Sequence, residues 1–154
     1  MIKRVYIDTS VLGGYFDTEF SKDTIPFFEK LISKKVEIIV SETLELEIYR
    51  APEFIIDFYE SLQNIVKVEL TMEVKNLAEK YIEEKVVGRT SIADCQHIAL
   101  ATIHIVDVLV SWNFKHIVNL ERIRGYNSIN IREGYKMIEI RTPKEIFDYG
   151  SNNK

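Results

Sequence analysis

The feature that most constrains the fold is a repeated alternation of short apolar runs with longer amphipathic segments. The short runs are rich in β-branched and aromatic residues, as in Val5-Tyr6-Ile7 and in VEIIVS (residues 36–41), and they predict strands. The longer segments place apolar residues at helical spacing. Strands that alternate with helices predict an α/β/α sandwich with a mainly parallel central sheet, covered by helices on both faces.

The same patterns give the expected boundaries. Strands are expected at residues 3–8, 36–41, 107–112, 129–132 and 137–143. Helices are expected at 24–34, 41–51, 53–65, 72–86, 91–105 and 143–149, with a helical connection at 113–127. Ser41 is the expected N-cap of the helix that follows the second strand. Ligands of parallel sheets bind outside the carboxyl ends of the strands, so polar residues at those ends are the first candidates for a ligand site.

The composition favours a single domain over residues 1–150, followed by a disordered tail at 151–154. Apolar residues make up 46% of the chain and charged residues 29%, which is typical of a soluble globular domain. We expect no membrane segment and a cytoplasmic location, because no long apolar run or signal peptide is evident and Cys95 is the single cysteine. The net charge of −4 argues weakly against a protein that binds nucleic acid by charge alone.

Asp8 raises the first functional question, because it ends a strand that reads as buried. A charged group at the edge of a core is costly unless it is paired or holds a cation. Asp8, Thr9 or Ser10 could instead cap the segment that follows. A metal site in this chain would have to use carboxylates or histidines.

Two further acids lie on the apolar side of expected helices. Glu47 falls beside the apolar face of the 41–51 helix, although spacing alone favours a surface glutamate. Asp94 shares a helix face with His97, but Ser91 and Asp94 also fit a capping box. On general grounds His97 is expected to pack in the core, although it could touch the site. Asp107 begins a strand, so we expect it at the opposite edge of the sheet from Asp8, in a structural role.

Taken together, the segments YIDTSVL, SETLELEI, ADCQHIALA and DVLVSWNFKHI resemble, in this order, the PIN-domain family. These are small metal-dependent nucleases that include the toxins of VapBC-type toxin–antitoxin modules. The resemblance implies that Asp8, Glu47 and Asp94 bind Mg²⁺ or Mn²⁺ at the carboxyl edge of the sheet, supported by Ser10. Asn113 takes the fourth position, which is commonly Asp, and its neutral oxygen puts binding of a second metal in doubt.

The resemblance implies a metal-dependent ribonuclease that hydrolyses RNA phosphodiester bonds with a cation-activated water. It further implies that the protein is the toxin of a VapBC-type pair, with an antitoxin as partner and a homodimer as its assembly. The alternative is a PIN-fold RNA- or protein-binding module with weak or no nuclease activity. Asn113 and the acidic balance slightly favour this alternative.

Overall fold

The computed structural model describes residues 1–88 and 91–146, and within them five parallel strands form one sheet. The strand order is β3-β2-β1-β4-β5. The strands are β1 (Arg4–Ile7), β2 (Glu37–Ser41), β3 (Ile65–Val68), β4 (Val108–Val110) and β5 (Ile140–Arg141). Every strand pairing is parallel, and β1 lies at the centre between β2 and β4. Residues that follow β1 therefore lie between the carboxyl ends of β2 and β4.

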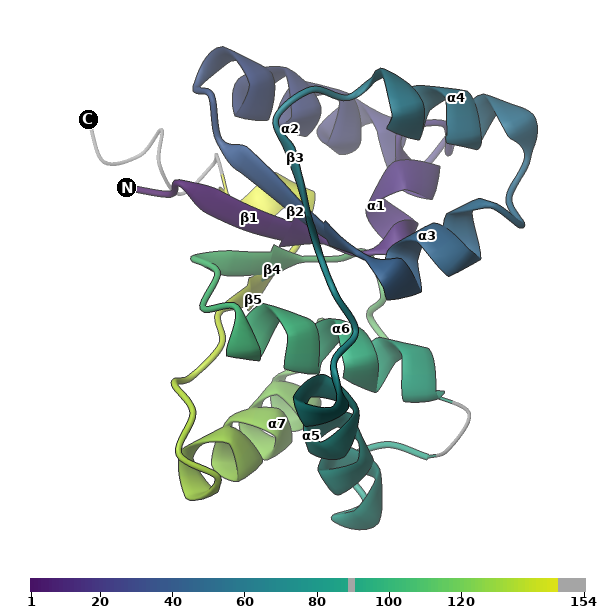
Figure 1. Cartoon of the computed structure of the whole chain (residues 1–154). Helices are drawn as coiled ribbons and strands as arrows, with labels where there is room; N and C mark the ends of the chain where they lie inside the picture. The colour runs from purple at the N-terminus through teal and green to yellow at the C-terminus, as the bar shows by residue number, and fades with distance from the viewer. Residues whose placement is uncertain (89–90, 147–154) are drawn as a thin grey trace.

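Helices cover both faces of this sheet, as Figure 1 shows. One layer contains α1 (Thr9–Gly14), α2 (Ser21–Ser33), α3 (Glu42–Ile48) and α4 (Glu53–Ser61). The other contains α5 (Met72–Glu83), α6 (Ile92–Ile103) and α7 (Leu120–Arg132). The predicted α/β/α sandwich is confirmed. None of the helices in the described ranges is long and apolar enough to cross a membrane.

Side-chain alternation along β1 divides the core in two. Val5 and Ile7 pack with the residues of α1 to α4, whereas Tyr6 packs with those of α5 to α7. All three side chains are fully buried. Because successive strand residues point to opposite faces, the residue two positions after Tyr6 continues its face. That residue is Asp8, so the strand directs it toward the α6 side of the sheet edge.

The passage from β2 into α3 shows how the chain turns at this edge. Ser41 is both the last residue of β2 and the N-cap of α3, and its Oγ accepts a hydrogen bond from the Leu44 N–H at 3.2 Å. The predicted N-cap is thus confirmed. With no intervening loop, α3 starts directly at the carboxyl end of the strand that neighbours β1.

Several predicted elements differ from the structure, among them the strand expected at 137–143, which is reduced to Ile140–Arg141. The helix expected over 53–65 ends at Ser61, and Ile65–Val68 form the edge strand β3 after a turn in which Asn64 has φ 62°. The strand expected at 129–132 is the last turn of α7, because Ile129 and Asn130 are buried there at helical spacing from Tyr126. The helical connection expected from residue 113 begins only at Leu120.

The last expected helix is helical over residues 143–146, and the rest of it lies outside the described residues, as does the 151–154 tail.

At the amino edge of the sheet, Asp107 Oδ2 accepts the N–H groups of Lys3 and Arg4 at 2.7 and 2.8 Å. The structural role expected for Asp107 is therefore confirmed.

Candidate active site

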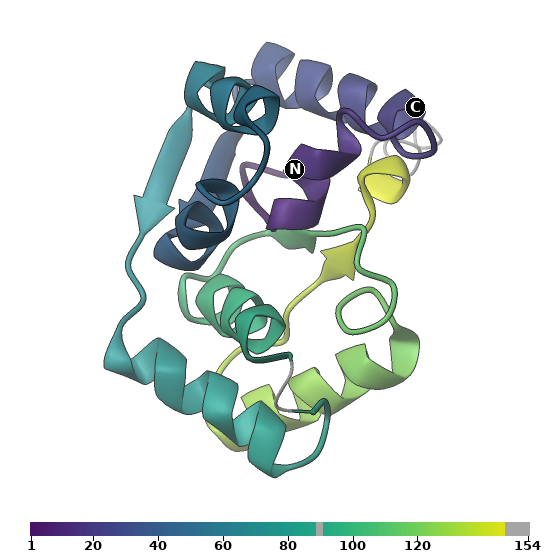
Figure 2. The ribbon, with the colours of Figure 1, turned by 90° about the vertical axis from the view of Figure 1, so that its right-hand side faces the viewer.

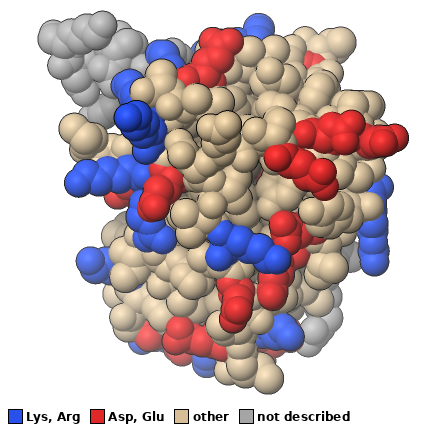
Figure 3. Space-filling model, turned by 45° about the horizontal axis from the view of Figure 1, so that its top comes forward, with Lys and Arg blue, Asp and Glu red and all other residues tan. Residues whose placement is uncertain are grey.

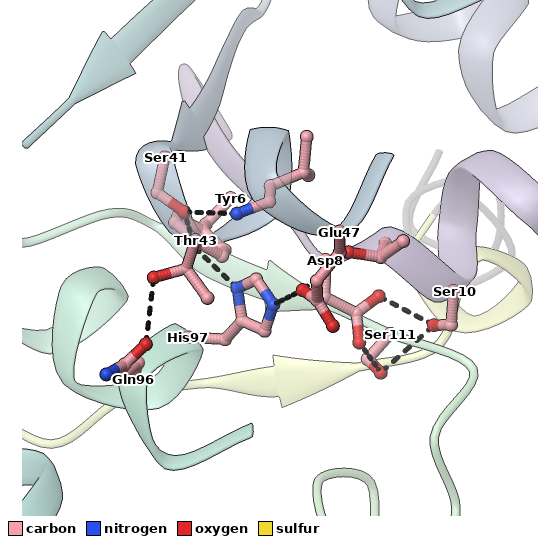
Figure 4. A network of polar contacts seen from close by, with 11 residues as sticks. Tyr6, Asp8, Ser10, Ser41, Thr43, Glu47, Gln96, His97 and Ser111 are labelled. Carbon is pink, nitrogen blue, oxygen red and sulfur yellow. Dashed lines mark hydrogen bonds and ion pairs between the residues drawn. The ribbon is translucent and has the colours of Figure 1, made fainter. Parts of the chain in front are cut away.

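Asp8 follows β1 directly and is only 3% exposed. Its Oδ1 accepts a hydrogen bond from Ser10 Oγ and its Oδ2 accepts one from Ser111 Oγ, both at 2.6 Å (Figure 4). Burial raises the pKa of Asp8, although the nearby His97 ring and the two hydroxyl groups act in the opposite direction. Asp8 is the N-cap residue of α1, but its side chain makes no capping hydrogen bond. The capping alternative for this carboxylate is therefore wrong.

The two serines also tie the loop after β4 to Asp8. Ser10 Oγ accepts the N–H of Trp112 at 2.9 Å, and Ser111 Oγ accepts the N–H of Asn113 at 2.9 Å. The prediction identified Ser10 as a supporting residue but missed Ser111. The sequence does place Ser111 immediately after the strand VLV, at the edge where a ligand site is expected. It was missed because residue spacing cannot show that this strand pairs with β1, which is what brings Ser111 next to Asp8.

Glu47 reaches the same region from α3. Its Oε1 accepts a hydrogen bond from Thr9 Oγ1 at 2.8 Å and lies 2.7 Å from His97 Nε2. Burial alone would raise the pKa of Glu47, but the hydrogen bonds from His97 and Thr9 outweigh it and lower the pKa. The alternative of a surface glutamate that merely covers the core does not hold.

His97 connects Glu47 to the core. The imidazole lies on α6, is 1% exposed, and contacts Tyr6 edge-on with ring centroids 5.7 Å apart. Its Nδ1 lies 2.7 Å from Tyr6 Oη, which in turn lies 2.7 Å from Ser41 Oγ. Figure 4 shows the ring between Ser41 on one side and the carboxylates of Asp8 and Glu47 on the other. His97 thus packs in the core, as expected, and also contacts the site.

Asp94 lies in the first turn of α6 and pairs with His116. Asp94 Oδ2 is 3.1 Å from His116 Nδ1, and Ser91 Oγ is 2.6 Å from the same nitrogen. Ser91 is the N-cap residue but its side chain makes no capping hydrogen bond, so the expected capping box does not form. Asn113 Oδ1 accepts the N–H of His116 at 3.0 Å, which fixes the turn after β4.

The three acids therefore lie on segments that meet at the carboxyl edge of the sheet, the edge that faces the viewer in Figure 2. Asp94 is close enough to Asp8 to raise its pKa, which adds to the larger effect of burial. The oxygen donors of Asp8, Glu47 and Asp94 fit Mg²⁺ or Mn²⁺ chemically, since these hard cations prefer carboxylate oxygens. Within residues 1–88 and 91–146, however, no three acidic, histidine or cysteine side chains form a ready-made metal cluster.

No family model and no curated protein sequence matches this chain significantly. Among solved structures, it is similar to a chain of VapBC2 from Rickettsia felis, determined with a DNA fragment from the promoter. The two chains superpose with a TM-score of 0.57 at 13% sequence identity, over 90% of this chain and 98% of the other. A likeness at this identity concerns the fold, which is an α/β fold of the PIN-like type.

Proposed function

We propose that the protein is a metal-dependent ribonuclease that hydrolyses RNA phosphodiester bonds and acts as the toxin of a VapBC-type pair. The observation that carries the proposal is Asp8, a buried carboxylate at the end of the central strand, held by two serine hydroxyls. No lysine or arginine is among the hydrogen-bond or ion-pair partners found for it in the described residues. Burying a carboxylate without a cation beside it lowers the stability of the fold, so its presence here favours a function that needs the negative charge, such as binding of a metal ion.

In this proposal Asp8, Glu47 and Asp94 hold Mg²⁺ or Mn²⁺. The bound cation supplies a water of lowered pKa and neutralises charge on the phosphate. Ser10 and Ser111 keep both oxygens of Asp8 in a fixed orientation. Glu47 and Asp94 each contact an imidazole, His97 and His116 respectively, so a bound cation would share these carboxylates with the two rings.

The fold supports the toxin assignment, since the similar chain belongs to a VapBC complex. On this basis we propose a VapB-like antitoxin as partner and a homodimer as the assembly. The face in Figure 3 carries acidic and basic side chains interspersed, with no continuous basic band. Together with the net charge of −4, this distribution indicates that RNA binding would rely on local contacts rather than on a general positive field.

The second candidate is a PIN-fold module that binds RNA or protein and has weak or no nuclease activity. Two observations favour it: the described acids form no ready-made metal cluster, and Asn113 contributes no charge at the fourth position. The Oδ1 of Asn113 is moreover engaged with the His116 N–H. Under this candidate the polar network would serve to hold the loops in place.

Cleavage of a labelled panel of single-stranded and hairpin RNAs separates the two candidates. The wild-type protein and Asp8→Asn are incubated with Mg²⁺, with Mn²⁺ or with EDTA. The nuclease proposal predicts cleavage by the wild type that requires the metal and is lost in Asp8→Asn. Binding without cleavage by the folded, metal-loaded wild type would support the binding module. Cleavage that persists in Asp8→Asn would contradict the site assignment.

A further inference from the structure

A line of buried polar groups runs from the core to Glu47 through Ser41, Tyr6 and His97. Three of these side chains are at most 1% exposed, and each successive pair is 2.7 Å apart. They come from β2, β1, α6 and α3, so four separate elements meet along this line. Neither metal binding nor phosphate chemistry by itself requires such a line behind Glu47.

The direction of the hydrogen bonds can be worked out from the groups themselves. An ionised carboxylate only accepts hydrogen bonds, so the contact of 2.7 Å requires a hydrogen on His97 Nε2. A neutral ring with its hydrogen on Nδ1 would instead direct a lone pair at Glu47. At the other end, Ser41 Oγ already accepts the Leu44 N–H and keeps its own hydrogen to donate.

Two hydrogen patterns are compatible with the three contacts. In the first, Ser41 donates to Tyr6 and Tyr6 donates to Nδ1, so every hydrogen in the line has an acceptor. In the second, a doubly protonated ring donates to Tyr6 and Tyr6 donates to Ser41, whose own hydrogen then has no acceptor in the line. Both patterns place a hydrogen on Nε2 and direct it at Glu47. Tyr6 and Ser41 thus fix which way the imidazole faces, because a flipped ring would lose its partners at both nitrogens.

We infer that His97 is a positioning residue, which holds Glu47 through an Nε2–H···Oε1 hydrogen bond whose direction is set by Tyr6 and Ser41. The inference rests on the proposed function, in which Glu47 is a metal ligand. Thr9 and His97 both donate to Oε1, while Oε2 has no donor among the described residues. One oxygen of Glu47 therefore anchors the side chain and the other is left for a ligand.

Nitrogen-15 NMR of the histidine rings in the full-length, metal-free protein tests the geometry without reference to activity. We expect the Nε2 of His97 to show the chemical shift and one-bond coupling of a protonated ring nitrogen. A ring protonated only on Nδ1 would overturn the inference. Tyr6→Phe should broaden or shift these signals, because Nδ1 then loses its partner. Unchanged signals in that variant would also contradict the proposed line.

Mn²⁺ affinity, followed by the loss of the free-ion EPR signal, tests the positioning itself. His97→Leu removes the donor, and we expect its affinity to fall about 10- to 100-fold, as for other groups that orient metal ligands. His97→Gln keeps an N–H near the place of Nε2 and should retain affinity close to that of the wild type. The matched control is His104→Leu at the C-cap of the same helix, since the buried Nε2 of His104 has no hydrogen-bond partner among the described residues.

The outcomes separate the positioning role from the proposed function. Equal affinity of His97→Leu, His104→Leu and the wild type would overturn the positioning role alone. Wild-type protein that binds no Mn²⁺ would overturn the proposed function and the positioning role together, whereas the NMR result on Nε2 would still describe the hydrogen bond. Loss of affinity in His97→Leu with recovery in His97→Gln supports the inference, provided that circular dichroism shows both variants folded.

Discussion

Removing the hydroxyl group of Tyr6 should destabilise the protein without creating an appreciable cavity. Tyr6 is fully buried, and its Oη is the shared partner of Ser41 Oγ and His97 Nδ1 at 2.7 Å each. In Tyr6→Phe the ring still packs, but two buried polar groups lose a partner. Each such group costs about 1–3 kcal/mol, and Ser41 retains the Leu44 N–H, so we expect a total loss of about 2 kcal/mol.

Urea unfolding followed by circular dichroism, with metal absent, measures this loss from the transition midpoint and the slope. The slope should not change, because the substitution leaves the surface exposed on unfolding almost the same. Tyr15→Phe is the matched control, since the Tyr15 hydroxyl has no hydrogen-bond partner among the described residues, although its ring packs against Phe28 and Phe58. Its change should stay within about 0.5 kcal/mol. A loss in Tyr6→Phe as small as in this control would refute the account of the buried line.

Two other perturbations have definite expected outcomes. Burial raises the pKa of Asp8 above its ordinary value of 3.8. Between the pKa of the unfolded chain and the higher pKa of the folded protein, the folded protein binds more protons, so wild-type stability falls as the pH rises through this window. Asp8→Asn does not titrate and should therefore unfold at a higher urea concentration than the metal-free wild type at neutral pH, with a difference that shrinks toward acid pH. Saturating Mn²⁺ should reverse this order, because only the wild type gains binding energy. A metal-free wild type that is more stable than Asp8→Asn at neutral pH would contradict the prediction. Gly14→Ala should cost about 1–3 kcal/mol in urea unfolding, since a Cβ there would lie 2.7 Å from Trp112 Cδ1. Gly13→Ala, whose Cβ would meet nothing within 4 Å, should be neutral or stabilising, and equal effects of the two substitutions would show that the Trp112 contact is unimportant.

The elements that the sequence predicts well are those in which local pattern and final environment agree. The strand before Asp8 and the one that ends at Ser41 are buried on both faces, and their apolar runs reflect this directly. The capping role of Ser41 is likewise local, because the donor lies three residues further along the chain.

The elements that it predicts poorly depend on distant partners. Residues 65–68 form an edge strand with a partly exposed surface, so their pattern resembles the end of the preceding helix. The strand expected at 129–132 has β-branched residues, but packing of Ile129 in the core formed with α5 and α6 makes it helical. In both cases tertiary contacts outweigh the local preference.

The candidate site shows the same division. Ser10 lies two residues from Asp8, and the motif indicates it. Ser111 is 103 residues from Asp8, and His97 is 50 residues from Glu47, so each of these contacts depends on the strand order and on the placement of α6. Residue spacing can place an acid on a helix face, but it cannot identify the hydroxyl or imidazole group that will hold it.

The central claim is that Asp8 takes part in metal-dependent RNA cleavage because of its place at the carboxyl edge of the sheet. The most direct test compares the cleavage rates of Asp8→Asn and Asp107→Asn in Mn²⁺, because both aspartates adjoin a strand and accept hydrogen bonds, but at opposite edges. We expect Asp107→Asn to retain the wild-type rate within a few-fold, and Asp8→Asn to lose more than the 10- to 100-fold typical of groups that only orient a metal ligand. Similar rates for the two folded variants would contradict the claim.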